Sequence, residues 1–315
     1  MNLHILMPAL NEEKNIRSAI HELVSAVSAL SDVGELRITV VDDHSSDATF
    51  DIVQGIQDER VSCIRLSRQS GSHVALRAAL KESVGDVVLC ISADGQDDPS
   101  CIAQMLHKWS SGAHIIWALR EDRSEEYWFS CLTAQMFYRV LVWLTHAGTA
   151  DIDLSRADFF LLDTKVVNAI NDCPERNTSL FGLIAWLGFK QDFVIYKRRK
   201  RLHGSSKWSF RKRMRLAKDW IVAFSGLPLK MMTHVGIWVA LMGFAYSVYI
   251  AVNFSIGEPI QGWSSTMVVI LVLGGMQMIM FGIVGEYLWR NLDESRRRPL
   301  YFIERESAHS VDRNS

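Results

Sequence analysis

Two long segments without charged side chains constrain most strongly how this 315-residue chain can fold. Residues 234–254 and residues 259–285 contain no Asp, Glu, Lys or Arg. Each segment reaches the length of about 20 apolar residues that a helix needs to cross a bilayer. The alternative is a pair of buried helices in a soluble bundle. The sequence predicts a transmembrane hairpin, with helices at residues 231–254 and 263–286.

The charges beside this hairpin predict which side of the membrane the rest of the chain occupies. Lys230 precedes the hairpin, and Arg290 and the arginines at residues 296–298 follow it. The connection at residues 255–262 carries one charge, from Glu258. Basic residues next to membrane helices stay on the cytoplasmic side, so we expect a multi-pass protein of the inner (cell) membrane with both termini in the cytosol. The expected parts are a cytosolic domain with a basic juxtamembrane segment at residues 1–226, the hairpin at residues 227–290 and a cytosolic tail at residues 291–315.

The chain before the hairpin alternates short apolar runs with amphipathic stretches. Because strands that alternate with helices form a mostly parallel sheet with helices on both faces, we expect an α/β fold. The expected strands are residues 3–7, 36–41, 61–66, 87–91, 113–119, 151–162 and 192–196. The expected helices in the first part of the chain are residues 15–30, 48–56 and 71–83.

Acidic side chains follow three of the expected strands. Glu12, Asp42 and Asp94 come after the first, second and fourth strands. The carboxyl ends of parallel strands lie at one edge of the sheet, where ligands bind in open α/β folds. The run C-I-S-A-D-G-Q-D-D-P at residues 90–99 offers oxygen donors suited to Mg²⁺ or Mn²⁺, from Asp94, Gln96, Asp97 and Asp98. An ordinary acidic strand-to-helix loop would look the same, but the convergence of all three strand ends predicts a nucleotide-type site.

Two further segments carry charge or aromatic side chains that point to a membrane surface. Residues 197–218 are strongly basic and include Trp208 and Phe210, which indicates contact with lipid head groups or phosphates rather than a solvated face alone. Residues 125–146 form an aromatic-rich helical pattern, typical of either a core helix or a helix lying on the membrane. The net charge of −1 gives no overall field that would favour nucleic acid.

Several motifs resemble glycosyltransferase family 2, which has the GT-A fold. They are P-A-L-N-E-E at residues 8–13, V-V-D-D-H-S-S-D-A-T at residues 40–49 and A-D-G-Q at residues 93–96. Two later stretches, Y-K-R-R-K-R-L-H-G-S-S-K at residues 196–207 and G-E-Y-L-W-R-N-L-D-E-S-R-R-R-P-L-Y at residues 285–301, resemble the polyprenyl-phosphate glycosyltransferases of that family. These include dolichol-phosphate mannose synthases and bactoprenol glucosyltransferases with a two-helix C-terminal hairpin.

This resemblance implies an inverting transfer of a sugar from a nucleotide sugar, such as UDP-glucose, to polyprenyl (undecaprenyl) phosphate at the cytosolic membrane face. It also implies a Mg²⁺ or Mn²⁺ cofactor, and it leaves a homo-oligomer open. The implied nucleotide-sugar site consists of Pro8, Leu10, Glu12, Asp42, Arg120, Arg201 and Lys207. Asp94 and Gln96 are the implied metal ligands, and Asp94 and Asp158 the implied catalytic residues.

The sequence departs from the family pattern at four positions. Ser92 stands where the family usually has the first Asp of an Asp-x-Asp metal motif. Phe160, Thr178 and Phe181 occupy positions where many relatives have Arg, which leaves the donor sugar open. A polysaccharide synthase of the same family is one alternative, although such enzymes usually carry a Q-x-x-R-W segment that this sequence lacks. A membrane-binding relative with impaired catalysis is the other alternative.

Overall fold

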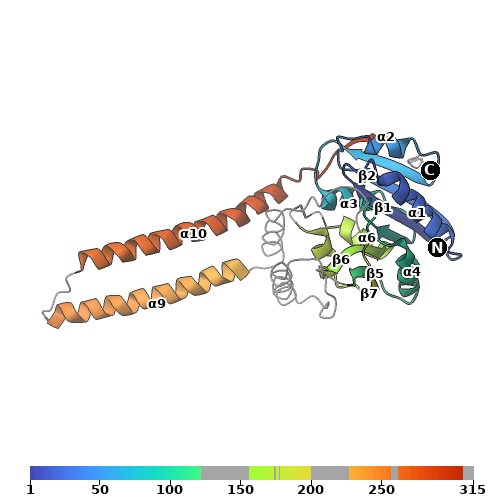
Figure 1. Ribbon diagram of the computed structural model, residues 1–315. Helices are drawn as coiled ribbons and strands as arrows, with labels where there is room; N and C mark the ends of the chain where they lie inside the picture. Colours follow the sequence, from blue (N-terminus) through green and yellow to red (C-terminus); the bar gives the residue numbers. More distant parts are fainter. Residues whose placement is uncertain (122–155, 174, 177, 200–226, 257–261, 308–315) are drawn as a thin grey trace. The chain divides into compact units, whose positions relative to one another are not determined.

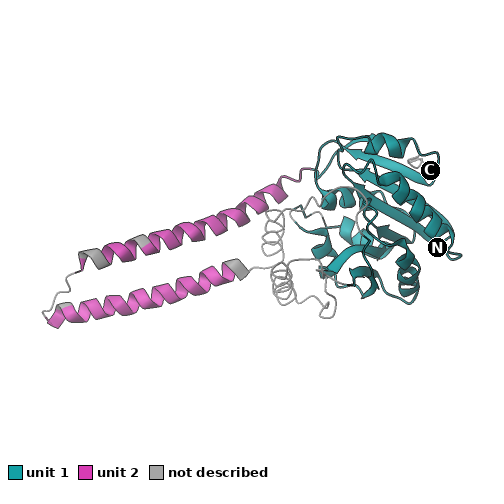
Figure 2. Ribbon diagram, in the orientation of Figure 1, with its two compact units in different colours: residues 1–217, 299–315 teal, residues 218–298 magenta. Residues whose placement is uncertain are grey.

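A computed structural model describes residues 1–121, 156–173, 175–176, 178–199, 227–256 and 262–307 of the chain. The chain divides into two compact units (Figure 2). The first contains residues 1–217 and 299–315, and the second contains residues 218–298. The expected helix at residues 125–146 lies outside the described residues.

The first unit is built on one mixed sheet with the strand order β7-β5-β6-β4-β1-β2-β3-β8 (Figure 1). Most neighbouring strands are parallel, but β6 is antiparallel to β4 and β5, and β8 is antiparallel to β3. The mostly parallel α/β fold predicted from the sequence is therefore confirmed. The strands are β1 Asn2–Ala9, β2 Glu35–Asp42, β3 Val61–Leu66, β4 Val87–Cys90, β5 Ile115–Arg120, β6 Ala157–Asp163, β7 Gln191–Tyr196 and β8 Ile303–Glu306.

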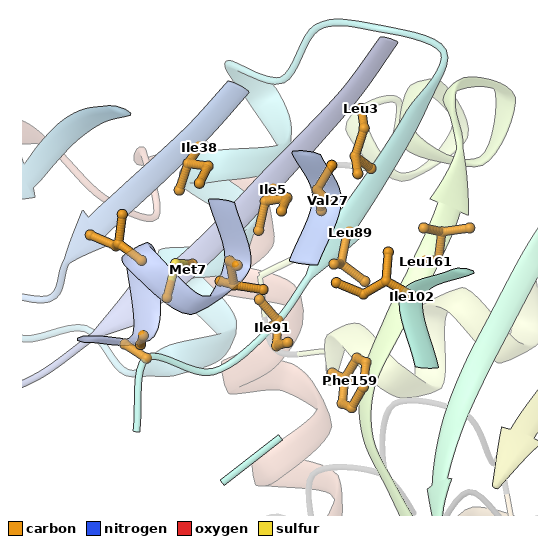
Figure 3. Close-up of a cluster of buried hydrophobic side chains, with 14 of the residues drawn as sticks. Leu3, Ile5, Met7, Val27, Ile38, Leu89, Ile91, Ile102, Phe159 and Leu161 are labelled. Atoms are coloured by element: carbon orange, nitrogen blue, oxygen red, sulfur yellow. The ribbon is translucent and has the colours of Figure 1, made fainter. Parts of the chain in front are cut away.

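Helices pack on both faces of this sheet, and β1 shows how the sequence specifies the two faces. Ile5 and Met7 belong to the apolar cluster beneath α1, α2 and α4 (Figure 3). Leu6 points to the opposite face and joins the cluster formed with α3, α6 and α7. Successive side chains of a strand alternate between faces, so an uninterrupted apolar strand must be covered on both. The helices are α1 Ile16–Ser28, α2 Thr49–Gln54, α3 Ser72–Lys81, the 3₁₀ turn η1 Pro99–Cys101, α4 Ile102–Ser110, α6 Thr164–Asn171 and α7 Leu180–Trp186.

The edge strand β8 is a strand of the sheet that sequence reasoning missed. The sequence predicts a tail over residues 291–315, yet Ile303–Glu306 pairs with β3 in the sheet. Its sequence, I-E-R-E, has one apolar residue, so it lacks the apolar run by which the other strands were found. A short, highly charged strand suits a sheet edge, because charge there discourages pairing with other chains.

The second unit contains two long helices, α9 Leu227–Ile256 and α10 Trp263–Ser295 (Figure 1). Both are long and apolar enough to cross a membrane, over Leu229–Asn253 and Thr266–Ser295. Large apolar side chains on both helices are exposed, including Phe244 and Phe281 at 71% each. An apolar surface of this extent marks a membrane or protein interaction site. Each helix extends several residues beyond the predicted bounds.

Candidate active site

The carboxyl ends of β4, β1 and β2 lie next to one another at one edge of the sheet. These strands are consecutive in the sheet and parallel, and Ala9 at the end of β1 is paired with Asp42 at the end of β2. Asp94 lies four residues beyond Cys90, the last residue of β4. The topology thus brings the segments that carry Glu12, Asp42 and Asp94 to one edge, as parallel strand ends require.

The loop after β1 is bound to the loop after β2. Glu12 donates its backbone N–H to Thr49 Oγ1 at 2.8 Å, and its carboxylate accepts from Asn15 Nδ2 at 2.7 Å. Asn11, at φ 51°, accepts the backbone N–H of Ser46 at 2.8 Å. Glu12 is buried and therefore supports the loop, while Pro8 lies in β1 opposite Val41 and Leu10 follows the strand.

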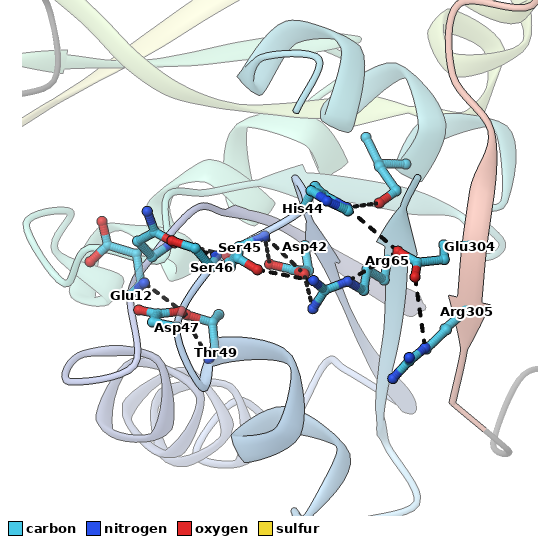
Figure 4. Close-up of polar contacts among 12 residues, drawn as sticks. Glu12, Asp42, His44, Ser45, Ser46, Asp47, Thr49, Arg65, Glu304 and Arg305 are labelled. Carbon is cyan, nitrogen blue, oxygen red and sulfur yellow. Dashed lines mark hydrogen bonds and ion pairs between the residues drawn. The ribbon is translucent and has the colours of Figure 1, made fainter. Parts of the chain in front are cut away.

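Asp42 is the most enclosed of those predicted site residues that the structure describes. Its side chain is fully buried, and its carboxylate accepts the Ser45 N–H at 3.1 Å and pairs with Arg65 at 3.3 Å (Figure 4). The neighbouring Asp43 accepts from the backbone N–H groups of Ser70 and Gly71. Burial raises the pKa of Asp43 above its usual value. In this structure Asp42 shapes the loop, because its carboxylate is occupied by protein groups.

The loop after β4 turns sharply at Gly95, whose φ of +71° is readily accessible to glycine. Asp94 accepts the backbone N–H of Gln96 at 3.2 Å. Gln96 Oε1 accepts from Arg198 at 2.9 Å, and its backbone carbonyl accepts the Arg199 N–H at 2.9 Å. Gln96 therefore connects this loop to the segment after β7.

A second group of polar side chains surrounds Asp158, at the start of β6. Its carboxylate pairs with Arg120, the last residue of β5, at 3.0 Å. It also pairs with Arg198 at 3.8 Å. The Tyr196 hydroxyl lies 2.6 Å from Asp158 Oδ2 and 3.0 Å from Asp97 Oδ1. Asp97 also accepts the backbone N–H of Ser92 at 3.2 Å. The predicted residues Arg120 and Asp158 are thus in direct contact.

The Tyr196 hydroxyl links two carboxyl groups but has one proton to donate. Both contacts are satisfied together when Tyr196 donates to Asp158 and a protonated Asp97 donates to the Tyr196 oxygen. Burial, followed by the charges of Asp158 and Asp94, raises the pKa of Asp97 to about 7. Burial also raises the pKa of the Tyr196 hydroxyl, so the phenol keeps its proton. The chain of hydrogen bonds therefore runs from Asp97 through Tyr196 to the Asp158 carboxylate.

The oxygen donors at this edge fit a divalent cation that is only partly enclosed by protein. Within the described part of the chain, no group of three or more His, Cys, Asp or Glu side chains is arranged to hold a metal ion. Mg²⁺ is commonly held by one or two carboxylates together with substrate phosphates and water. The Asp94 carboxylate suits that arrangement. Gln96 Oε1 is engaged by Arg198, which favours Asp94 as the protein ligand.

Sequence reasoning missed the parts of this site that depend on distant contacts. Tyr196, Arg198 and Asp97 belong to motifs that the sequence singled out, but their mutual contacts span about 100 residues and leave no periodic signal. The predicted residues Arg201 and Lys207 lie outside the described residues.

Comparisons with known proteins identify the family of this chain. The profile of glycosyl transferase family 2 matches residues 4–155, and that of the GtrB C-terminal hairpin matches residues 227–290. An uncharacterised glycosyltransferase of Synechocystis sp. is 38% identical, over 96% of this chain and 95% of its own. The prophage bactoprenol glucosyl transferase homolog of Escherichia coli is 34% identical, over 97% of this chain and 99% of its own.

Among solved structures, mannosyl-3-phosphoglycerate synthase from Rubrobacter xylanophilus is similar with a TM-score of 0.50 at 17% identity. That match covers 71% of this chain and 73% of the other, and it supports the fold alone. The resemblance seen in the sequence motifs is confirmed by the near-full-length relatives. The chain is a glycosyltransferase and belongs to glycosyltransferase family 2.

Proposed function

We propose that this enzyme transfers one sugar from a nucleotide sugar to a polyprenyl phosphate at the cytosolic face of the membrane. The observation that carries the proposal is the similarity to bactoprenol glucosyl transferases, which runs through the hairpin. The helices α9 and α10 have the length and composition to anchor the enzyme in the bilayer that holds such a lipid. The names of these relatives make UDP-glucose the first donor to test and undecaprenyl phosphate the first acceptor.

The proposed acceptor needs little activation. A phosphate monoester has a second pKa of about 6 and is mostly a dianion at pH 7. One of its oxygens attacks the anomeric carbon of the donor, while the bond from that carbon to the diphosphate breaks. A single displacement inverts the anomeric centre and releases the nucleoside diphosphate. The main obstacle is the approach of an anionic acceptor to an anionic donor.

The residues at the sheet edge can offset this repulsion. A divalent cation held by Asp94 would neutralise charge on the diphosphate as it leaves. Arg120 and Arg198 bring two fixed positive charges to Asp158. Because Asp158 is held by these groups and by Tyr196, its proposed role is to position the acceptor site rather than to remove a proton.

The remaining assignments follow from the sequence motifs. Pro8, Leu10 and Glu12 are proposed to line one side of the nucleotide site. Asp42 holds the loop after β2, which is proposed to lie beside the base of the nucleotide. Arg201 and Lys207 are proposed to contact the diphosphate. Both flanks of the hairpin are proposed to face the cytosol, since they carry its positive charges. A homo-oligomer is compatible with this arrangement.

The proposal is tested by incubating the full-length protein with undecaprenyl phosphate and a panel of UDP- and GDP-linked sugars. Mass spectrometry of the lipid should show one added sugar with one donor. Lipid products that grow by repeated sugars would support a polysaccharide synthase instead. Donor binding without transfer to lipid, for every donor in the panel, would support a relative with impaired catalysis.

Removing the Tyr196 hydroxyl should lower turnover without unfolding the protein. In Tyr196→Phe the ring still packs against Phe159, 5.1 Å away, but Asp158 loses its 2.6 Å hydrogen bond. A hydrogen bond to a charged group contributes about 1.5–3 kcal/mol, so kcat should fall roughly tenfold or more. The measurement is steady-state kinetics beside thermal unfolding. An unchanged kcat in a folded variant would show that the Tyr196 hydroxyl does not contribute to turnover.

A further inference from the structure

The chain returns to the sheet of the first unit after α10 ends at Ser295. The backbone N–H of Ser67 donates to Phe302 O at 2.9 Å, and Ser307 N–H donates to Cys63 O at 2.9 Å. Ser307 Oγ also accepts the Cys63 N–H at 2.8 Å. These bonds fix β8 along the second half of β3, from Cys63 to Ser67. The segment after the hairpin is therefore an integral part of the sheet, at the edge next to β3 and β2.

Glu304 of β8 points toward the loop that follows β2 (Figure 4). Its Oε2 lies 3.3 Å from Arg65 Nε and 3.5 Å from His44 Nδ1. His44 has a φ of 59°, which is uncommon for a residue with a side chain. Its Nδ1 is also 3.1 Å from the Leu66 carbonyl. Glu304 thus contacts one residue of the loop and one residue of β3.

Arg65 connects Glu304 to the buried Asp42. Its Nη1 lies 3.3 Å from Asp42 Oδ2, and its Nη2 donates to the Ser45 carbonyl at 3.0 Å. The guanidinium also lies over the Phe50 ring, with its carbon 5.5 Å from the centroid. A guanidinium holds several donors in a fixed plane, so fixing one edge of it orients the others. Glu304 holds the edge that carries Nε.

We propose that Glu304 is a positioning residue for the base-binding end of the donor site, acting through Arg65 on Asp42 and directly on His44. The inference rests on the proposed use of a nucleotide-sugar donor. It assigns to the segment after the hairpin a part in donor recognition. The predicted cytosolic domain of residues 1–226 is therefore incomplete as a donor-binding unit, since it lacks both β8 and Glu304.

The test is donor binding and kinetics of full-length Glu304→Gln. This change keeps the shape of the side chain and removes the charge that pairs with Arg65 and faces His44. The Glu304 side chain is 37% exposed, and exposed ion pairs contribute modestly, so the donor KM should rise roughly threefold to fivefold. The kcat and the KM for the lipid phosphate should stay within about twofold.

Two variants of the same segment serve as controls. Arg305→Gln removes a charge from a side chain that is 64% exposed and lies 4.0 Å from Glu304, and it should leave the donor KM unchanged. Ser307→Ala removes the bond to Cys63 and should lower the unfolding temperature without raising the donor KM. A donor KM raised equally by Ser307→Ala and Glu304→Gln would show that β8 acts only as structural support, and would overturn the proposal.

A double variant shows whether Glu304 acts through Arg65. Residues in one ion-pair network give non-additive effects, so Glu304→Gln combined with Arg65→Gln should show nearly the donor KM of Arg65→Gln alone. Direct titration of the wild-type protein with UDP-glucose and the other donors tests the proposed function separately from the role of Glu304. Wild-type protein that binds none of them overturns the proposed function and this inference with it. Wild-type binding that Glu304→Gln leaves unchanged overturns this inference alone.

Discussion

We expect Asp94→Asn to lose most metal-dependent turnover while the protein stays folded and bound to the membrane. Asp94 follows the buried strand β4 and precedes the turn at Gly95, so its carboxylate is presented at the sheet edge. Ser92 stands where the family usually has a second carboxylate, and a hydroxyl cannot replace that charge. Loss of the anionic ligand should lower kcat by about 100-fold or more, the scale of removing one key electrostatic contact in an active site.

The measurement is turnover against Mg²⁺ and Mn²⁺ concentration. Asp98→Asn is the matched control in the same loop, because Asn can still accept the Ser100 N–H that Asp98 accepts at 3.0 Å. Asp98 also pairs with Arg199 at the surface, and exposed pairs contribute little. Near-normal activity of Asp94→Asn at limiting metal would show that this carboxylate does not bind the ion.

The sheet was predictable because most of its strands carry their own signal. The runs that became β1, β2, β3 and β4 are apolar on both faces and end in polar residues, so their type and end point could be inferred from sequence. β8 could not be inferred in this way. Its place depends on pairing with β3, which lies some 240 residues earlier in the chain, as the bond from Cys63 to Ser307 shows.

The location of the site at the sheet edge was predictable, but the contacts within the site were not. Parallel strand order brings the segments with Glu12, Asp42 and Asp94 to one edge, and this follows from the alternation of strands and helices alone. The strand order does not predict how deeply each of these side chains is buried. Asp42 proved fully buried against Arg65, whereas Asp97, noted only as an oxygen donor, became the partner of Tyr196. Such differences are set by tertiary packing.

The position of β8 also changes what a truncated protein should do. Sequence alone suggests that the chain before the hairpin is a self-contained domain. Removing everything after residue 226 would expose the edge of β3 and delete Glu304. An exposed strand edge invites aggregation. The hairpin and the proposed donor site are therefore linked through the chain, because the segment that follows the hairpin carries β8 and Glu304.

Asp158→Asn should reduce turnover by about 100-fold or more through loss of the charge that organises the second group of side chains. The Asp158 carboxylate accepts from Tyr196 at 2.6 Å and faces Arg120 at 3.0 Å and Arg198 at 3.8 Å. An Asn side chain keeps one acceptor oxygen and places an N–H group where another donor already points. The two guanidinium groups would then lack their shared counter-charge and would move.

Asp163→Asn is the control, because Asp163 lies at the other end of β6 and its side chain is 16% exposed, against 13% for Asp158. Asn can also cap α6, as Asp163 does.

The pH dependence of the Asp158→Asn variant then distinguishes positioning from proton removal. The acceptor phosphate is largely a dianion at about pH 8 but gains a proton near pH 6, where a base would matter most. If Asp158 positions the acceptor, kcat should fall at both pH values, with the size of the loss differing because Asp97, whose pKa is about 7, loses its proton over this range. A loss confined to the lower pH would make Asp158 a general base, and a loss shared by Asp163→Asn would show that the strand had been disturbed.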